Sequence, residues 1–271
     1  MLKSYHPFAF FVSAWKYREL VLPLTRRRIS ARYRGSFLGM SWAILTPLML
    51  LAIYTFIFSI VFQSKWGLES GNQTEFALVL FSGLILYSVF SDCVNEAPSL
   101  LVGNKLYIRQ LVFPTEILAW TCVLGSLFNL AINSAILTIF YAIVMGPPPA
   151  TLFLLPLIAL PIVLMTLGAV WFLSSIGIFV QDLAQVVGLL TTALLFLSPI
   201  FYPASAVPES FQATYTLNPF VPILEMARDV IFSGELPAWQ SLGKLFLGSW
   251  LFAWLGYIWF MKAKKGFADV V

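Results

Sequence analysis

Residues 117–181 read ILAWTCVLGSLFNLAINSAILTIFYAIVMGPPPATLFLLPLIALPIVLMTLGAVWFLSSIGIFVQ, and these 65 residues contain no Asp, Glu, Lys, Arg or His. A helix needs about 20 apolar residues to cross a bilayer, so the stretch is too long for one helix and suits two. The run Gly146-Pro147-Pro148-Pro149 interrupts it near the middle. Because a proline cluster ends a helix, the stretch predicts two membrane-spanning helices joined at residues 146–149.

The composition of the whole chain extends this interpretation. Of the 271 residues, 60% are hydrophobic and only 10% are charged, and the mean hydropathy is +0.88. A soluble domain carries about 25% charged residues, so these proportions exclude an ordinary globular fold. One His and two Cys, at positions 93 and 122, are too few for a zinc cluster or a disulfide framework. The predicted fold class is an all-α polytopic membrane protein.

The same count of charge-free runs predicts six transmembrane helices in a domain of residues 35–262. The expected spans are 35–63, 76–97, 114–145, 151–180, 183–202 and 242–261. Residues 1–34 are expected to form a cytoplasmic N-terminal segment with an interfacial amphipathic helix, and residues 263–271 a cytoplasmic tail. Between the last two spans, residues 203–240 contain five prolines and form an external region with helices too short to cross.

The distribution of Lys and Arg predicts the orientation. Thirteen of these residues fall in the segments assigned to the inside: Lys3, Lys16, Arg18, Arg26, Arg27, Arg28, Arg32, Arg34, Lys105, Arg109, Lys262, Lys264 and Lys265. Three fall outside, at Lys65, Arg228 and Lys244. Cytoplasmic loops carry the excess of positive charge, so both termini are expected in the cytoplasm and the number of spans is expected to be even.

A basic cluster stands directly before the first span. Its members are Arg26, Arg27, Arg28, Arg32, Tyr33 and Arg34. One interpretation is a topogenic anchor on anionic lipid, worth about 1 kcal/mol per basic residue. The alternative is an anion site, because Arg28 and Arg32 share a helical face and guanidinium groups suit phosphate or pyrophosphate.

The inside loop at residues 98–112 carries apolar side chains at helical spacing. It is either an interfacial turn or a short helix that docks in the groove of a soluble partner. Its candidate coupling residues are Leu101, Asn104, Lys105, Tyr107, Ile108 and Arg109. The chain has no G-x-x-x-x-G-K-[ST] motif and no room for a nucleotide-binding fold, so docking to a partner that supplies energy is attractive. Asp182 is interpreted as a loop residue or helix cap rather than an ion relay.

The external segment 220–233 predicts an amphipathic helix with Ile223 and Ala227 on its apolar face and Glu225, Arg228 and Asp229 on a wet face. With prolines on both sides, the segment suits a re-entrant pair that dips into the outer leaflet, either as a gate or as a packing hairpin. The 44 aromatic residues divide between the membrane interface and, where they line a path, contacts with sugar faces.

Several stretches, in order, resemble the type-2 ABC-transporter permeases, specifically the branch that exports lipid-linked polysaccharides such as O-antigen, capsule and teichoic acid. They are residues 28–39 with Trp42 and Pro47, Asn104, residues 113–117, residues 198–203, Val207-Pro208, and Asn218-Pro219 with Pro222, Glu225 and Arg228. The resemblance extends over most of the chain. This chain departs from the family pattern at Arg28, where relatives often carry an acidic residue, and at Gln181, where relatives often carry Arg.

The resemblance implies a permease subunit of the bacterial inner membrane that is itself no enzyme. It implies a homodimer with a channel between the two copies and two soluble ABC ATPase subunits, which bind the ATP and Mg; no cofactor is expected in this chain and no nucleic acid as partner. The implied substrate is an undecaprenyl-diphosphate-linked glycan, met at the basic cluster. Residues 98–112 become the coupling helix, and the external gate is assigned to Tyr202, Pro203, Pro208, Asn218, Pro219, Glu225 and Arg228. The alternatives are a permease for drugs or small amphiphiles and an ion-coupled carrier or channel.

Overall fold

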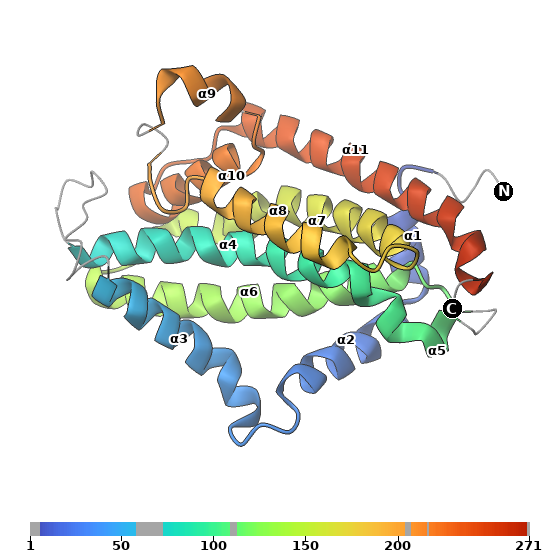
Figure 1. Ribbon diagram of the computed structural model, residues 1–271. Helices are drawn as coiled ribbons and strands as arrows, with labels where there is room; N and C mark the ends of the chain where they lie inside the picture. The colour runs from blue at the N-terminus through green and yellow to red at the C-terminus, as the bar shows by residue number, and fades with distance from the viewer. Residues whose placement is uncertain (1–5, 58–72, 109–112, 204–206, 216, 270–271) are drawn as a thin grey trace.

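The computed structural model describes residues 6–57, 73–108, 113–203, 207–215 and 217–269. Within these ranges the chain is helical and has no strand, so the predicted all-α membrane fold is confirmed (Figure 1). The predicted positions of Lys65 and Arg109 lie outside the described residues.

The longest helices run between two ends of the molecule, and the shorter helices lie near those ends. They are α1 (Ala9–Lys16), α2 (Arg18–Tyr33), α3 (Trp42–Tyr54), α4 (Gln73–Leu100), α5 (Lys105–Ile108), α6 (Ile117–Val144), α7 (Leu155–Gly177), α8 (Leu183–Leu197), α9 (Glu209–Tyr215), α10 (Phe220–Arg228) and α11 (Trp239–Ala263). Among the described residues, five helical stretches are long and apolar enough to cross a membrane: Gly39–Ile57, Glu75–Leu100, Ile117–Val144, Ala150–Gly177 and Trp239–Phe267. The apolar helix α8 is shorter, at 15 residues, so the count of six spans stays a prediction.

The charge-free stretch of 65 residues divides where the prolines predict. Helix α6 ends at Val144, and Gly146 follows with φ +93°, a left-handed conformation that favours glycine. Pro149 then precedes the 3₁₀ turn Ala150–Leu154, which leads directly into α7. The chain therefore reverses within residues 145–149, and α6 and α7 run in opposite directions.

Helix α7 packs at the centre of the bundle, and glycines set how closely its neighbours approach. A Cβ at Gly256 of α11 would lie 2.4 Å from the Gly168 carbonyl oxygen, and one at Gly177 would lie 2.3 Å from the Pro98 carbonyl oxygen of α4. Lipid offers no hydrophobic force between helices, so close backbone contact of this kind supplies the packing energy. The fully buried Trp171 fills the adjacent core and makes an edge contact with Phe10 of α1.

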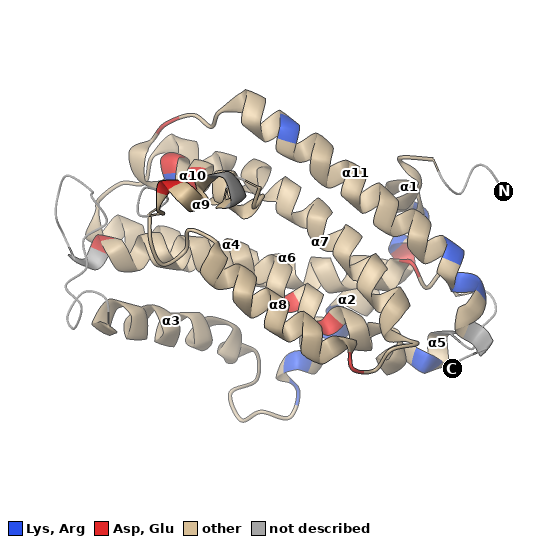
Figure 2. Cartoon of the chain, turned by 45° about the horizontal axis from the view of Figure 1, so that its top comes forward, with Lys and Arg blue, Asp and Glu red and all other residues tan. Residues whose placement is uncertain are grey.

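The two ends of the bundle differ in charge. Helices α1 and α5 and the last turns of α11 lie at one end, and α9 and α10 lie at the other (Figure 1). Figure 2 shows most of the described Lys and Arg positions at the first end. Helices α2 and α3 diverge from the bundle and meet through residues 34–41. This arrangement fits the predicted orientation, and the cytoplasmic location of the first end stays a prediction.

Candidate functional site

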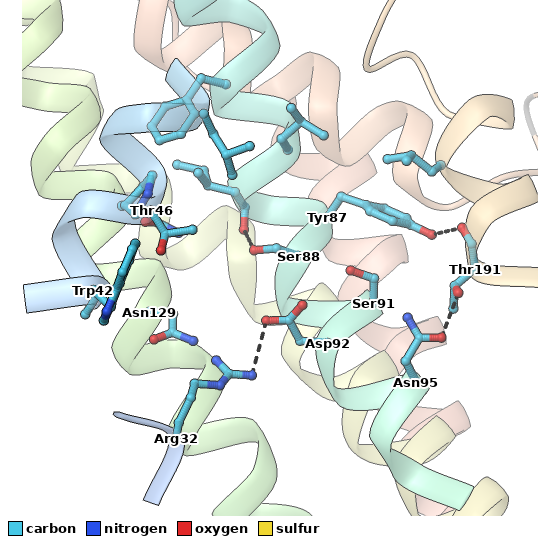
Figure 3. Close-up of a pocket in the computed structure, with 18 of the residues that line it drawn as sticks. Arg32, Trp42, Thr46, Tyr87, Ser88, Ser91, Asp92, Asn95, Asn129 and Thr191 are labelled. Atoms are coloured by element: carbon cyan, nitrogen blue, oxygen red, sulfur yellow. Dashed lines mark hydrogen bonds and ion pairs between the residues drawn. The ribbon is translucent and has the colours of Figure 1, made fainter. Parts of the chain in front are cut away.

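A cavity of about 700 Å³ opens between α3, α4, α6 and α8. One part of its lining is apolar and aromatic, with Trp42 and Tyr54 from α3 and Tyr87 from α4. The other part is polar and comes from three helices: Ser88, Ser91, Asp92 and Asn95 of α4, Asn129 and Asn133 of α6, and Thr191 and Thr192 of α8. Figure 3 shows the labelled side chains from these elements gathered around one space.

Hydrogen bonds hold part of the polar wall in place. Thr191 Oγ1 donates to Asn95 Oδ1 at 2.8 Å, and the Tyr87 hydroxyl donates to the Thr191 carbonyl oxygen (Figure 3). The Tyr33 hydroxyl, at the end of α2, donates to Asn129 Oδ1 at 3.4 Å. Polar groups within membrane helices cost free energy, so amides and hydroxyls that face one cavity from three helices indicate a hydrophilic ligand or path.

Sequence reasoning did not identify this wall. A signal was present, because Ser88, Ser91, Asp92 and Asn95 recur at intervals of three and four residues, and Asn129 and Asn133 are four apart. Each pair or quartet predicts one polar face on an otherwise apolar helix. The pattern alone does not indicate that the two faces point toward each other, because that depends on how α4 and α6 pack.

The basic cluster lies beside the cavity, and two of its members are paired within the chain. Arg28 forms an ion pair with Glu96, and Arg32 Nη2 lies 3.8 Å from Asp92 Oδ2. Arg28 Nη2 also donates to Cys122 Sγ at 3.2 Å. The two arginines share a helical face, as predicted, but this face meets two carboxylates of α4. The sequence reasoning missed both carboxylates as partners.

The other members of the cluster lie nearer the surface. Arg26 and Arg34 are exposed, and Arg27 Nη1 donates to the Tyr107 hydroxyl at 3.3 Å. Tyr33 and Arg32 both line the large cavity. The structure therefore brings Arg28, Arg32 and Tyr33 to one small cavity, turns Arg27 toward Tyr107, and leaves Arg26 and Arg34 exposed away from both.

The loop after α4 forms a short 3₁₀ turn, Val102–Asn104, followed by the four-residue helix α5. Of the candidate coupling residues, Lys105 is exposed, while Asn104 Nδ2 donates to the Leu100 carbonyl oxygen at 2.8 Å. Leu101 is fully buried in this chain's own core, where it cannot contact a partner. Leu106, which the sequence reasoning omitted, is 78% exposed. Ile108 is placed only as the last residue of α5, and Arg109 lies outside the described residues.

A groove of about 620 Å³ separates this loop from α2. It is lined by Leu24, Arg27, Arg28, Ala31, Val102, Gly103, Asn104, Lys105, Leu106, Tyr107, Leu118 and Thr121. The Tyr107 ring stacks on Phe113 with centroids 4.6 Å apart, while its hydroxyl reaches Arg27 across the groove. The groove therefore lies next to the basic cluster and shares Arg27 and Arg28 with it.

At the opposite end of the bundle, the predicted external helix is present as α10 and a π-helical turn, Asp229–Ser233. The prediction of a wet face was right for Glu225, which is exposed, and wrong for Arg228, which is buried. Arg228 Nη2 donates to the carbonyl oxygens of Pro199 and Ile200, just beyond α8. Irregular backbone exposes unpaired carbonyls, and a buried guanidinium satisfies them.

The remaining candidate gate residues lie around this contact. Asn218 Nδ2 donates to Ser198 Oγ at 3.0 Å, and the Tyr202 hydroxyl donates to the Phe196 carbonyl oxygen at 2.8 Å. Pro203 follows the end of α8, Pro208 precedes α9, and Pro219 precedes α10. Burial lowers the pKa of Arg228 to about 10, so its guanidinium stays charged at neutral pH. Partial desolvation at the protein surface also raises the pKa of the Glu225 carboxyl above its usual value.

A partly buried ion pair that the sequence reasoning did not identify joins distant segments near the other end. Lys264 Nζ lies 2.7 Å from Glu116 Oε2, and Ser13 Oγ donates to Glu116 Oε1 at 3.3 Å. The Glu116 carbonyl oxygen accepts from Trp171 Nε1 at 3.0 Å. Glu116 therefore connects α1, the start of α6, α7 and the residues after α11.

The geometry defines a class of protein before any comparison is made: a multi-pass membrane protein with a polar cavity between its helices, a basic surface helix and a short exposed loop helix. Among the described residues, no group of three His, Cys, Asp or Glu side chains could hold a metal ion.

Comparison with known families and proteins gives a consistent result. Residues 19–232 match the ABC-2 type transporter family, and the chain belongs to that family. It is 26% identical over 259 residues to the O-antigen export system permease protein RfbA of Myxococcus xanthus, covering 95% of this chain and 97% of that protein. It is 26% identical to RfbA of Klebsiella pneumoniae, over 93% of this chain and 95% of that protein. It is 23% identical to the polysialic acid transport protein KpsM of Escherichia coli, over 81% of this chain and 83% of that protein.

The predicted resemblance to a polysaccharide-export ABC permease is thereby confirmed at the level of the family and of the relatives' names. The chain is a membrane permease subunit rather than an enzyme.

Proposed function

We propose that this chain is the transmembrane subunit of an ATP-driven exporter that moves a polysaccharide across the bacterial inner membrane on an undecaprenyl-diphosphate carrier. The family assignment supports the transporter class, and the names of the relatives support polysaccharide as the cargo. The observation that carries the proposal is the cavity between α3, α4, α6 and α8. It combines aromatic rings with amides and hydroxyls, and sugars require both kinds of contact.

The basic cluster has a defined place in this function. Arg26, Arg27, Arg28, Arg32 and Arg34, with Tyr33, meet the diphosphate of the carrier at the membrane surface while the glycan enters the cavity. Guanidinium groups bind phosphate oxygens in pairs of parallel hydrogen bonds, which favours this assignment. The polyprenyl chain stays in lipid, and α3 diverges from the bundle on that side.

The energy comes from two copies of a soluble ABC ATPase that binds ATP and Mg. The short helix α5 and the adjacent groove are the docking site, because Leu106 is exposed there without a partner in its own core. An exposed apolar side chain on a loop helix suits insertion into a groove of another protein. Closure of the ATPase pair on ATP moves α5 and α2 together, since Arg27 and Tyr107 join them.

Two copies of the chain form the channel. Helices α3 and α8 border the cavity, and several of their large apolar side chains are exposed: Ile44, Met49, Leu50 and Ile53 of α3, and Val186, Leu189, Leu190, Phe196 and Leu197 of α8. A second copy on this side encloses the cavity and converts it into a path between the two ends. The region around Tyr202, Asn218 and Arg228 closes that path at the outer end.

The proposal is tested by reconstitution of this chain together with its partner ABC ATPase. Proteoliposomes receive undecaprenyl-diphosphate-linked glycan on one side, and an enzyme that trims the glycan on the other side reports transfer. Transfer that needs ATP, and ATPase activity that the glycan stimulates, is the expected result. Stimulation by drugs or small amphiphiles but not by glycan identifies the drug permease instead. Solute movement by the chain alone, without ATP or ATPase, identifies an ion-coupled carrier or channel and refutes the proposal.

A further inference from the structure

Two ion pairs join α2 to α4 in matching register. Arg28 and Arg32 stand four residues apart on α2, and Asp92 and Glu96 stand four residues apart on α4. Residues four apart lie on one face of a helix, so the two pairs form successive rungs between the helices. The Arg28 stem lies against α6 at Gly125, where an added Cβ would be 3.5 Å from Arg28 Cδ.

The rungs are accessible rather than locked in the core. The side chains of Arg32 and Asp92 are 49% and 41% exposed, and those of Arg28 and Glu96 are 25% and 42% exposed. The Arg32–Asp92 separation of 3.8 Å is longer than a direct hydrogen bond. Ion pairs with this exposure contribute little to stability, so a competing anion can displace the carboxylates.

The position of the rungs gives a ligand access to them. Arg32 and Asp92 line the large cavity, and all four side chains line a small adjoining cavity together with Ser126 and Asn129. The other groups that face this small cavity are Ile29, Tyr33, Cys93, Cys122 and Gly125, so the four paired side chains are its charged members among the described residues. An anion that enters from the cavity meets Arg32 first.

We propose that Asp92 and Glu96 are specificity determinants that keep Arg28 and Arg32 from binding ordinary anionic phospholipid and release them to a ligand with two adjacent phosphates. A phosphodiester headgroup brings one negative charge and compensates for the loss of one carboxylate. A diphosphate brings an anionic group for each arginine and replaces both carboxylates together. Because anionic phospholipid is in large excess in a bacterial membrane, two unpaired arginines would be occupied by it.

This inference rests on the proposed function, since it assumes a carrier lipid with a diphosphate. It adds a role for two carboxylates of α4 that neither the family nor the relatives' names assign. It also explains why the arginines are paired within the chain. The carboxylates of Asp92 and Glu96 bind them weakly, so the arginines stay available to the diphosphate and are not occupied by bulk phospholipid.

The test measures binding of undecaprenyl diphosphate to the purified full-length chain in nanodiscs, by native mass spectrometry. One set of discs contains only phosphatidylcholine, and the other is rich in phosphatidylglycerol. For the unmodified chain, we expect the dissociation constant to change by less than about twofold between the two sets. For Asp92→Asn with Glu96→Gln, we expect tighter binding in phosphatidylcholine and a loss of about tenfold when phosphatidylglycerol is present.

Two control variants separate this effect from general charge or folding effects. Glu19→Gln with Glu209→Gln removes two negative charges from exposed positions on α2 and α9 and is expected to behave like the unmodified chain. Asp92→Glu with Glu96→Asp retains both negative charges and is expected to restore the insensitivity to phosphatidylglycerol. Tighter binding of undecaprenyl diphosphate by Asp92→Asn with Glu96→Gln in phosphatidylcholine shows that this neutralised variant is folded.

Two results overturn the inference. If the neutralised variant stays as insensitive to phosphatidylglycerol as the unmodified chain, the carboxylates do not control which lipid reaches the arginines. The inference then fails, while the proposed export function stands. If the unmodified chain binds no undecaprenyl diphosphate in either disc, the carrier assignment and this inference fail together. The transfer assay with proteoliposomes then decides separately whether the chain exports polysaccharide.

Discussion

Replacement of Arg228 by Met tests whether α10 is fastened to the end of α8 as the structure indicates. Arg228 is buried, and its guanidinium donates to the carbonyl oxygens of Pro199 and Ile200. Met has a comparable length and no donor, so the substitution removes the hydrogen bonds and leaves most of the volume. It therefore isolates the polar contribution of the side chain from its packing.

The size of the effect follows from the contacts. A hydrogen bond that involves a charged group contributes about 1.5–3 kcal/mol, and the bond to Ile200, at 3.4 Å, is long and weak. Removal of the guanidinium also removes the cost of burying a charge, which offsets part of the loss. We expect a net destabilisation of about 2 kcal/mol, from the stronger bond to Pro199 and the carbonyl it leaves unpaired.

Two measurements report this change. A loss of about 2 kcal/mol lowers the Tm of a chain of this size by about 4–8 °C, measured for the purified protein in detergent. The same free energy raises the population in which the end of α8 is detached by a factor of about 30. Ile200 is fully buried, so an Ile200→Cys reporter reacts with a membrane-impermeant maleimide faster by that factor when Arg228 is Met.

Lys244→Met is the matched control, because Lys244 is an exposed residue of α11 at the same end of the bundle. It removes the same charge without removing a buried contact and is expected to leave Tm and labelling unchanged. Arg228→Lys keeps the charge and reaches fewer carbonyls, so its effect should lie between those of the unmodified chain and Arg228→Met. Equal Tm and equal labelling for Arg228→Met and Lys244→Met would refute the assignment of Arg228 as the fastening residue.

Three further predictions concern other parts of the molecule. Gly256→Ala puts a Cβ 2.4 Å from the Gly168 carbonyl oxygen and should lower the free energy of unfolding by about 1–3 kcal/mol. Gly243 faces open space on the same helix, so Gly243→Ala should cost little, and equal Tm values for the two variants contradict the close packing of α7 and α11. Lys264→Met should lower stability by about 1–3 kcal/mol, because it leaves the buried Glu116 carboxylate without its cation. Glu116→Gln should be milder, because Lys264 is the more exposed partner and its ammonium can reach water; the reverse order in Tm contradicts this. Leu106→Asp should abolish stimulation of the ATPase and leave Tm unchanged, because Leu106 contributes exposed surface and not core; full stimulation contradicts the docking site.

The sequence alone predicts much of the fold because lipid imposes a simple rule. A charge-free run of known length must be helical, since every backbone group needs a partner within its own segment. Residues 117–181 therefore divide into α6 and α7 at the prolines, and the segment 220–233 is helical as its pattern of apolar residues predicts. The rule says nothing about which helices touch, and the glycines at 168, 177 and 256 are informative only once α4, α7 and α11 are side by side.

The candidate site is predicted in part for the same reason. The position of the basic cluster is clear from the sequence because a run of arginines directly precedes a long charge-free stretch. Its partners Asp92 and Glu96 cannot be identified from the sequence, because a helical pattern shows which residues share a face and not which helix packs against that face. For Arg228, the sequence predicts the wrong environment. An arginine beside Glu225 and Asp229 predicts a solvated face, whereas the unpaired carbonyls of residues 199 and 200 make burial of the guanidinium favourable.

The two halves of the site are continuous, and this limits what kind of ligand can use both. Arg32 and Asp92 belong to the charged rungs and also line the polar cavity, so a molecule held at the rungs extends into the cavity without crossing a barrier of apolar side chains. A free sugar has no anionic group to pair with the arginines, and a phospholipid has no glycan to reach the amides of Asn129 and Asn133. A molecule that carries a diphosphate and a glycan on one lipid uses both halves at once. Its affinity then exceeds that of either part, because the second contact is made at high effective concentration.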